Sequence, residues 1–226
     1  MNLVDLPMRV APHPLLRPAA FTTSFPGPLG SLPSPAWLLD LLDLAARGPL
    51  ERDEEVRLAV RGMLRHWGHK PAGRGKPASE YLVRAVGEGE LGSINVGVDV
   101  CNVVSLHSGL PIALVDLDLA APPFRVARGA EGERYVFNPV GQEMELKGLI
   151  CLYDAQGPCA NPVKDAQRVK TREETTRTLT VIWGVLGHEV RRDAAVAWYR
   201  ELLERVGGEV AEVPVRLDSQ ADHSAQ

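Results

Sequence analysis

Polar side chains interrupt an otherwise apolar segment near the middle of the chain. Asn102 and Ser105 stand among valines on a predicted helix, and a polar group in such surroundings needs a hydrogen-bond partner or a ligand. Asp116 and Asp118 end the apolar run that follows, and their spacing points both to one face of a predicted strand. Open sheets bind ligands at strand ends of this kind. The segment therefore predicts a pocket with amide, hydroxyl and carboxylate groups.

Positive charge concentrates between residues 57 and 84. His66, Trp67 and Tyr81 lie in the same stretch and offer rings for stacking on bases. The formal net charge of the chain is -4, so the concentration is local and predicts a face that binds phosphates. A solvated face, whose long basic stems cover apolar surface, accounts for the pattern about as well. The basic residues are Arg57, Arg61, Arg65, Lys70, Arg74, Lys76 and Arg84, against Glu80 alone.

His107 and the cysteines carry weaker signals. His107 falls on the apolar face of its predicted helix, which favours a core histidine over a site residue. Cys151 and Cys159 lack the close pairing of a zinc site, and the histidines do not cluster with them. The sequence contains no glycine-rich phosphate loop and no metalloprotease motif. We therefore expect neither a metal nor a cofactor.

The composition indicates a folded cytoplasmic protein. Hydrophobic residues make up 45% of the 226 residues, which is enough for a sizeable core. No run approaches ~20 apolar residues, and the start lacks the pattern of a secretion signal, so neither a membrane span nor export is expected. Three cysteines are too few for a disulfide scaffold and favour a reducing compartment.

The first third of the chain predicts an arm followed by helices. Residues 7–35 hold eight of the 18 prolines, which disfavours a helix and predicts an extended arm or a loose leader. Ser34-Pro35 predicts a helix start and Gly48 its end, and a second helix is expected at Arg52–Trp67. A loop rich in Gly, Pro, Lys and Arg then leads to a short helix that starts at Ser79.

The remaining elements predict an α+β fold around a mixed sheet. A helix over Ser93–Ser108 is ended by Gly109 and Pro111, and a buried strand follows at Ile112–Val115. The hydrophobic period then changes from helical to extended. We expect strands at Phe124–Ala127, Tyr135–Phe137, Leu149–Asp154 and Thr178–Val185, a helix at Asp193–Val206, an edge strand at Glu209–Leu217 and a frayed tail at Asp218–Gln226.

Several motifs, in this order and spacing, resemble a known domain. Asn102–Asp118 is similar to a stretch of phenylalanyl-tRNA synthetase beta chains that reads asparagine, an apolar pair, a helix, Gly-x-Pro and Asp-Leu-Asp. Phe124–Glu133 resembles the strand pair of that family, Leu149–Asp154 its next apolar strand, and Lys170–Arg177 its threonine-bearing segment. The chain thus resembles, over roughly residues 60–190, the editing-type B3/4 domain of these beta chains in free-standing form.

The resemblance implies a fold and an activity. It implies the α+β fold of the synthetase editing domain, here with an N-terminal helical extension. In the synthetase this domain hydrolyses wrongly attached tyrosine from the tRNA. The resemblance therefore implies release of a wrong amino acid from mischarged tRNA in trans. Such a reaction needs a positioned water, a donor to the developing oxyanion and a group that holds the ammonium.

Candidate residues follow from the matching positions. The resemblance implies Asp116 or Asp118 for the ammonium and Thr171 with Thr175 for the water, although Thr171 also fits the cap of a turn through Glu174. The implied substrate-binding residues are Asn102, Ser105, His107, Arg125, Glu133 and Lys170. The implied tRNA-binding residues are Arg65, Lys70, Arg74, Lys76 and Arg84.

Two positions depart from the family pattern. The synthetase carries a histidine where this chain has Ala113, and a glutamate where it has Val181 and Ile182. Three functions therefore stay open: a deacylase that uses other groups, such as the 2′-hydroxyl of the substrate; a non-catalytic module that binds tRNA or an amino acid; and a metabolic enzyme that uses the same pocket.

We expect the chain to divide into five parts. They are a Pro-rich arm at 1–35, a helical extension with the basic loop at 36–90, an editing-like core at 91–190, a C-terminal helix and edge strand at 191–217, and a tail at 218–226.

Overall fold

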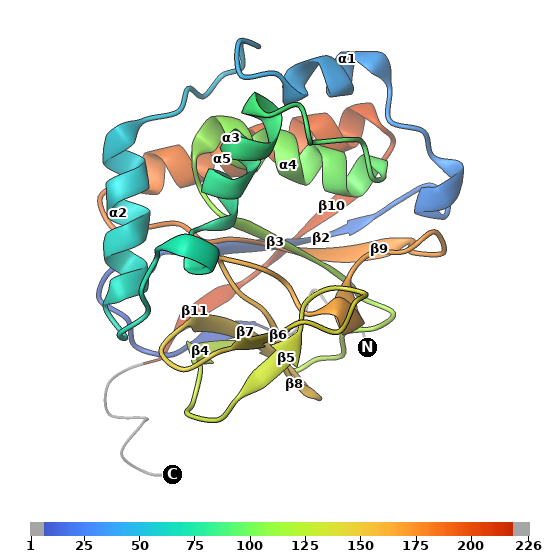
Figure 1. Ribbon diagram of the computed structural model, residues 1–226. Coiled ribbons are helices and arrows are strands. Elements are labelled where there is room, and N and C mark those ends of the chain that lie inside the picture. The colour runs from blue at the N-terminus through green and yellow to red at the C-terminus, as the bar shows by residue number, and fades with distance from the viewer. Residues whose placement is uncertain (1–6, 219–226) are drawn as a thin grey trace.

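Three layers make up the protein, seen in a computed structural model that describes residues 7–218 (Figure 1). Helices cover one face of a four-stranded sheet, and a five-stranded sheet lies against the other face. A two-stranded hairpin stands beside these layers. The mixture of helices with an antiparallel four-stranded sheet and a mixed five-stranded sheet, in which β1 pairs in parallel with β4 and β11, confirms the predicted α+β fold. Of the tail expected at 218–226, all residues after Asp218 lie outside the described residues.

The four-stranded sheet forms the middle layer. Its order is β10-β2-β9-β3, and each neighbouring pair is antiparallel. Strands β3 and β9 are buried on both faces, because a middle layer meets helices on one side and the second sheet on the other. Thr178 and Thr180 are therefore buried as fully as Leu179 and Val181. The bounds are Ala19–Ser24 for β2, Ile112–Asp116 for β3, Arg177–Ile182 for β9 and Glu209–Val213 for β10.

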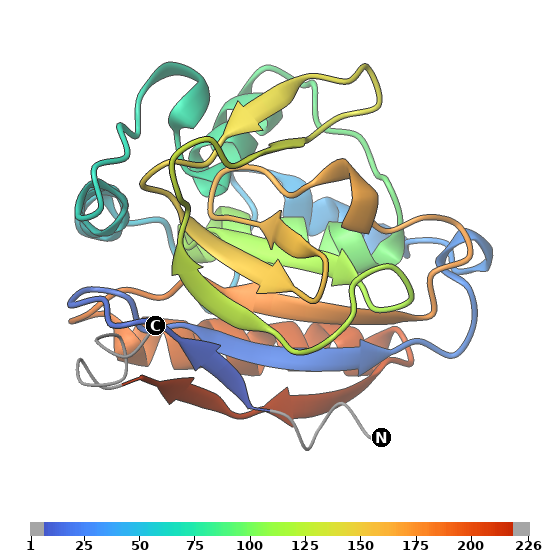
Figure 2. The same ribbon diagram turned by 90° about the horizontal axis from the view of Figure 1, so that it is seen from below.

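The five-stranded sheet has the order β11-β1-β4-β7-β8. Pro214 separates β10 from β11, so the expected edge strand is divided between the two sheets and runs along one edge of both (Figure 2). The bounds are Met8–Val10 for β1, Arg125–Arg128 for β4, Ile150–Asp154 for β7, Gly157–Ala160 for β8 and Val215–Leu217 for β11. The separate hairpin consists of β5, Arg134–Val136, and β6, Glu143–Glu145.

Residues 7–35 run through both sheets. The prolines in this stretch leave Ala19–Ser24 free, and this segment pairs with β10 on one side and β9 on the other. Met8–Val10 pairs with β4 and β11 in the second sheet. The extended backbone predicted from the prolines is thus part of the hydrogen-bonded framework.

The helices agree with the sequence prediction except near the N-terminus. They are α1, Ala36–Leu39; α2, Glu54–Arg65; α3, Ala78–Gly87; α4, Val96–Ser108; and α5, Glu189–Arg205. The predicted helix up to Gly48 was wrong: one turn of α-helix continues as a 3-10 turn that ends at Leu42. The backbone becomes extended at Asp43, whose carboxylate accepts a hydrogen bond from the amide of Ala45. Within residues 7–218 no helix is long and apolar enough to cross a bilayer.

Helix α4 is the central helix of the site. The side chain of Asn95 caps it by accepting from the amide of Val98, and Gly109 ends it with a φ of 72°, which a residue with a side chain rarely adopts. Pro111 follows and directs the chain into β3. Because this connection is so short, α4 packs directly over the strand that follows it.

Candidate functional site

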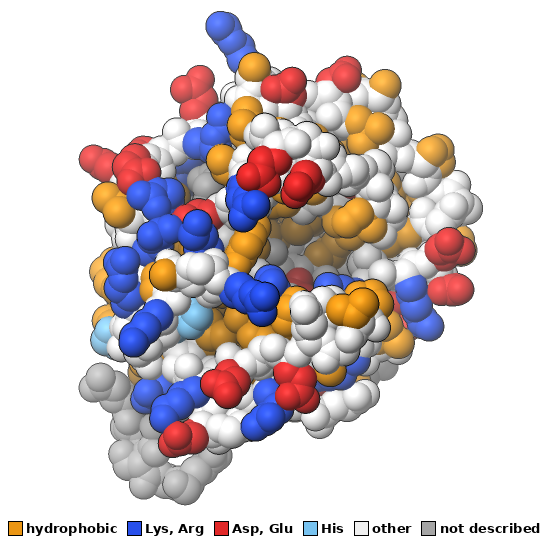
Figure 3. Space-filling model, in the orientation of Figure 1, with side chains coloured by type: hydrophobic (Ala, Val, Ile, Leu, Met, Phe, Trp, Pro, Cys, Tyr) orange, Lys and Arg blue, Asp and Glu red, His pale blue; other side chains and the backbone are white. Residues whose placement is uncertain are grey.

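A cavity of about 490 Å³ opens between α3, α4, β3 and the segment 163–171. It corresponds to the hollow in the middle of the face in Figure 3, where hydrophobic side chains form the floor and Lys and Arg side chains gather towards one rim. Its volume falls in the range of small-molecule sites. The lining residues are Ala78, Tyr81, Leu82, Ile94, Val98, Cys101, Asn102, Ser105, Ile112, Leu114, Val163, Lys164, Asp165, Lys170 and Thr171.

One face of α4 and one face of β3 form the cavity wall. Val98, Cys101, Asn102 and Ser105 are spaced three, four and seven residues from the first, so they share a helix face. Ile112 and Leu114 alternate along β3 and share a strand face. The polar residues that stood out on the apolar helix are therefore those that face the cavity.

Three uncharged polar side chains are available to a ligand. The hydroxyl of Ser105 donates to the carbonyl of Leu110 (2.8 Å) and keeps its acceptor capacity. The hydroxyl oxygen of Thr171 accepts from the amide group of Asn95 (3.1 Å), which leaves its hydrogen free to donate. The half-buried side-chain amide of Asn102 lines the cavity. Thr171 therefore hydrogen-bonds to Asn95, the residue that caps α4.

Asp165 places a carboxyl group in this largely apolar cavity. It is the only acidic residue among the described residues that line the space. Burial raises its pKa from 3.8 to about 7, although the amides of Leu114 and Asn161 and the charge of Lys170 act to lower it. The backbone amide of Leu114 donates a hydrogen bond of 3.4 Å to this carboxyl. Leu114 lies on β3, and the edge of β3 opposite β9 has no neighbouring strand in the sheet. A carboxyl with so few partners has capacity for a cationic ligand.

Two lysines stand at the mouth of the cavity. The ammonium of Lys170 donates to the carbonyl of Phe137 (2.6 Å), and that of Lys164 lies 4.1 Å from the centroid of the Phe137 ring. Burial lowers the pKa of both lysines; for Lys164 the charges of Arg74 and Lys170 lower it further. Arg74 is thus close enough for its charge to act at the cavity mouth.

The basic stretch divides into paired and unpaired side chains. Arg61 binds Glu80 with two hydrogen bonds of 2.6 Å, Arg57 binds Glu54, and Arg84 binds Glu88. These three arginines therefore have acidic partners within the fold. The other basic residues between positions 57 and 84 have no ion pair within the described part of the chain; they are Arg65, Lys70, Arg74 and Lys76.

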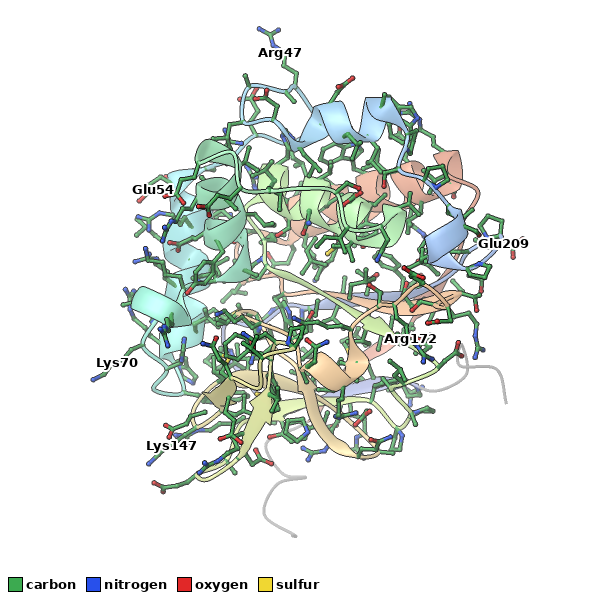
Figure 4. The ribbon with its side chains drawn as sticks, turned by 45° about the vertical axis from the view of Figure 1, so that its right-hand side comes forward. Arg47, Glu54, Lys70, Lys147, Arg172 and Glu209 are labelled. Carbon is green, nitrogen blue, oxygen red and sulfur yellow. The ribbon has the colours of Figure 1, made fainter. Side chains whose placement is uncertain are left out.

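The loop that carries three of the four unpaired residues, Lys70, Arg74 and Lys76, is held in place. The ring of His69 hydrogen-bonds the carbonyl of Gly75 (2.8 Å), and the hydroxyl of Tyr81 donates to the carbonyl of Gly73 (2.9 Å). Lys70 points away from the molecule into solvent (Figure 4). The basic surface formed by Arg65, Lys70, Arg74 and Lys76 thus has an ordered backbone and free cationic ends.

Asp116, Asp118 and Thr175 lie outside the cavity. Asp116 has no exposed surface; its carboxylate accepts from the hydroxyl of Thr175 (2.6 Å), Nε of Arg172 (3.3 Å) and the amide of Asp118 (2.8 Å). The carboxylate of Asp118 pairs with Arg177 at the surface (2.9 Å). The strand end predicted to bind a ligand is thus closed by side chains of the chain itself.

We expect Asp116→Ala to lower the free energy of unfolding by about 2–4 kcal/mol, because it leaves a buried hydroxyl and a backbone amide without their acceptor. Denaturant unfolding measures this change. Asp118→Ala is the matched control, since its exposed ion pair contributes at most about 1 kcal/mol. Unchanged stability of Asp116→Ala together with lost deacylation would instead assign Asp116 to catalysis.

Three other predicted substrate residues also lie away from the cavity. His107 is buried; its Nε2 hydrogen-bonds the carbonyl of Leu41 (2.8 Å), and its ring lies edge-on to Trp198. The guanidinium of Arg125 lies 4.0 Å from the ring centroid of Tyr153, and Glu133 accepts from the hydroxyl of the same tyrosine. Of the predicted site residues, the structure brings Asn102, Ser105, Lys170 and Thr171 together around one cavity.

The departures from the family pattern also fall outside the cavity. Ile112 and Leu114 line it, so strand alternation turns Ala113 to the opposite face of β3. Val181 and Ile182 are fully buried in β9 and are not part of the lining. Lys164 and Asp165, by contrast, line it and were not predicted; the sequence shows them only as charged residues of a loop. Within residues 7–218, no three His, Cys, Asp or Glu side chains gather as a metal site would require.

Comparison with known proteins agrees with this fold. An N-terminal fragment of the phenylalanyl-tRNA synthetase beta subunit from Pyrococcus horikoshii superposes with a TM-score of 0.52 at 13% identity, over 95% of this chain and 52% of the fragment. The chain thus spans about half the length of that structure. The TILS C-terminal domain matches 34% of this chain and 72% of its own, at 16% identity and a TM-score of 0.31, a level from which nothing follows here. No curated protein matches the sequence.

The protein is thus an α+β domain with a cavity between its central helix, α4, and the edge strand of its four-stranded sheet, β3. The sequence model of the B3/4 domain matches residues 71–201, more than half of the chain. The chain belongs to the B3/4 domain family, which confirms the resemblance inferred from its motifs.

Proposed function

We propose that this protein edits mischarged tRNA in trans by hydrolysing the ester between a wrong amino acid and the terminal ribose. The main support is Asp165, a carboxyl group at the wall of a cavity whose other described lining residues are apolar, uncharged polar or basic. An aminoacyl ester carries an ammonium beside its carbonyl and has no free carboxylate. A cavity with one acid and adjacent lysines complements this distribution of charge.

In this proposal Asp165 binds the α-ammonium of the substrate. The ammonium adds a counter-charge to a carboxyl whose pKa is raised by burial to about 7 in the free protein. Binding therefore lowers the pKa of Asp165 and releases a proton when the solution is below pH 7. The apolar side of α4 and Ile112 with Leu114 of β3 then contact the amino-acid side chain.

Lys170, Asn102 and Thr171 surround the reacting carbonyl in the proposal. The ammonium of Lys170 and the amide of Asn102 donate to the oxygen on which negative charge develops, and the hydroxyl of Thr171 orients the water. The water oxygen bonds to the carbonyl carbon, and the bond from that carbon to the ribose oxygen breaks. The ribose oxygen takes up the proton that the water loses. The products are a free amino acid and uncharged tRNA.

The basic surface provides the contact for the tRNA backbone. Arg65, Lys70, Arg74 and Lys76 have free cationic ends, and Arg74 acts on the cavity mouth through its charge. Phosphates held along this surface would lead the terminal nucleotide towards the cavity. We place this reaction in the cytoplasm, in keeping with the free cysteines Cys101, Cys151 and Cys159.

Binding without hydrolysis is the second candidate function, because Ala113, Val181 and Ile182 replace the histidine and glutamate of the synthetase pattern. A panel of tRNAs, each carrying one wrong amino acid, decides between the two. The purified protein is expected to release at least one amino acid well above the buffer rate. If every tRNA stays charged while binding with a steep salt dependence, the protein is a binding module.

A further inference from the structure

Two aromatic rings flank the cavity mouth and hold a lysine ammonium between them. The Nζ of Lys164 lies 4.1 Å from the ring centroid of Phe137 and 5.5 Å from that of Tyr81. Tyr81 comes from α3, and Phe137 directly follows β5. Both Tyr81 and Lys164 line the cavity, so this aromatic slot, formed by the Tyr81 and Phe137 rings, is continuous with it.

Backbone contacts fix the two sides of the slot. The hydroxyl of Tyr81 donates to the carbonyl of Gly73 in the basic loop (2.9 Å), and the carbonyl of Phe137 accepts from Lys170 (2.6 Å). Both rings are partly buried, so the neighbouring structure restricts their rotation while leaving surface for contact. The Tyr81 side of the slot is therefore bonded to the basic loop, and the Phe137 side is bonded to Lys170 of the cavity.

The ammonium in the slot is weakly held. Lys164 has no acidic partner within 4.0 Å among residues 7–218, and the nearby charges of Arg74 and Lys170 repel it. Contact with the ring faces is its main attraction, and a lysine stem turns easily about its four carbons. A flat aromatic group can replace the ammonium by stacking on these ring faces, while the displaced ammonium keeps a phosphate within its reach.

We propose that Tyr81 and Phe137 bind the base of the terminal nucleoside by stacking, and that Lys164 moves from between the rings to the adjoining phosphate. The inference rests on the proposed function, since an ester on the terminal ribose brings a base to the mouth when the amino acid fills the cavity. The ligand class is then an aminoacyl nucleotide. A free amino acid would occupy the cavity and leave the slot to Lys164.

Adenosine 5′-monophosphate and ribose 5-phosphate test this assignment, because they differ only in the base. Titration followed by NMR is expected to show the wild-type protein binding the first at least about tenfold more tightly, in line with base stacking on aromatic side chains. Phe137→Leu, which keeps an apolar side chain without a ring face, is expected to remove the difference. Phe137→Tyr, the matched control, is expected to keep it.

Equal affinity for the two compounds in the wild-type protein overturns the inference, as does an undiminished difference in Phe137→Leu. Unchanged thermal unfolding of Phe137→Leu excludes misfolding as the cause of a loss, and Tyr81→Leu repeats the test from the other side of the slot. Deacylation is measured separately. Ring-dependent binding without hydrolysis refutes the editing activity alone, and hydrolysis without ring-dependent binding refutes the slot alone.

Discussion

Replacing Asp165 by asparagine is expected to raise the KM for mischarged tRNA about 100-fold and to change kcat by less than about threefold. The amide keeps the shape of the side chain but removes the only acidic group that the described residues place in the cavity wall. Truncating one partner of a desolvated charge pair costs about 2–5 kcal/mol, and 1.4 kcal/mol corresponds to a factor of ten. Steady-state deacylation at pH 8, where the wild-type carboxyl is ionised, measures both constants.

The pH dependence separates this role from a structural one. Burial raises the pKa of Asp165 to about 7, so the wild-type kcat/KM is expected to fall tenfold for each pH unit below that value. Above pH 8 it falls again, because an α-amino group loses its proton there. Asp165→Asn is expected to lose the acid limb and keep the alkaline one. If its profile retains the acid limb, another group controls binding.

Protein stability gives an independent measurement of the same group. The folded protein keeps the Asp165 proton between about pH 4 and pH 7, whereas the unfolded chain loses it near pH 4. The free energy of unfolding therefore decreases as pH rises through this window, by at most about 4 kcal/mol at 1.36 kcal/mol per unit. Asp165→Asn lacks this contribution. Its difference in stability from the wild type is thus expected to grow between pH 4 and pH 7 and then to level off.

The part of the site that could be predicted from sequence lies on α4 and β3, two elements whose own residues show where they begin and end. Helix α4 and strand β3 follow from a helical period, a glycine at the helix end and a proline after it, all within Ser93–Val115. Asn102 and Ser105 were found because polar residues are costly on an apolar helix face unless they meet a partner or a ligand. For His107 the apolar helix face favoured a core histidine, and its ring hydrogen-bonds the carbonyl of Leu41, a partner that is distant in sequence.

The remainder depended on contacts between distant segments. Asp165 acquires its raised pKa because residues 163–171 lie along the free edge of β3, about fifty positions earlier in the chain. Nothing in the local sequence distinguishes this acid from Asp116, whose carboxylate accepts hydrogen bonds from Arg172 and Thr175. Strand β2 was hidden by the prolines on either side of it, and its partners β9 and β10 lie more than 150 residues later. Pairings at such separation leave no periodic pattern in one sequence.

The double variant Arg74→Ala with Lys76→Ala is expected to weaken binding of tRNA at least about tenfold at low salt and to leave folding unchanged. Each of these side chains lacks an ion pair among the described residues and is free to contact a phosphate. Removing one phosphate contact lowers the slope of log affinity against log salt concentration by about 1. Filter binding of tRNA at salt concentrations from about 50 to about 200 mM yields both the affinity and the slope.

Arg47 provides the matched control, since it is an exposed arginine that projects from the molecule well away from Lys70 (Figure 4). Arg47→Ala makes the same change of net charge per residue without touching the basic surface. The proposal requires that Arg47→Ala keeps the wild-type slope while the double variant loses about two units of it. An equal loss for each charge removed, about half as much for Arg47→Ala as for the double variant, would mean that tRNA responds to overall charge. In that case Arg65, Lys70, Arg74 and Lys76 form no specific contact and only the cavity selects the substrate.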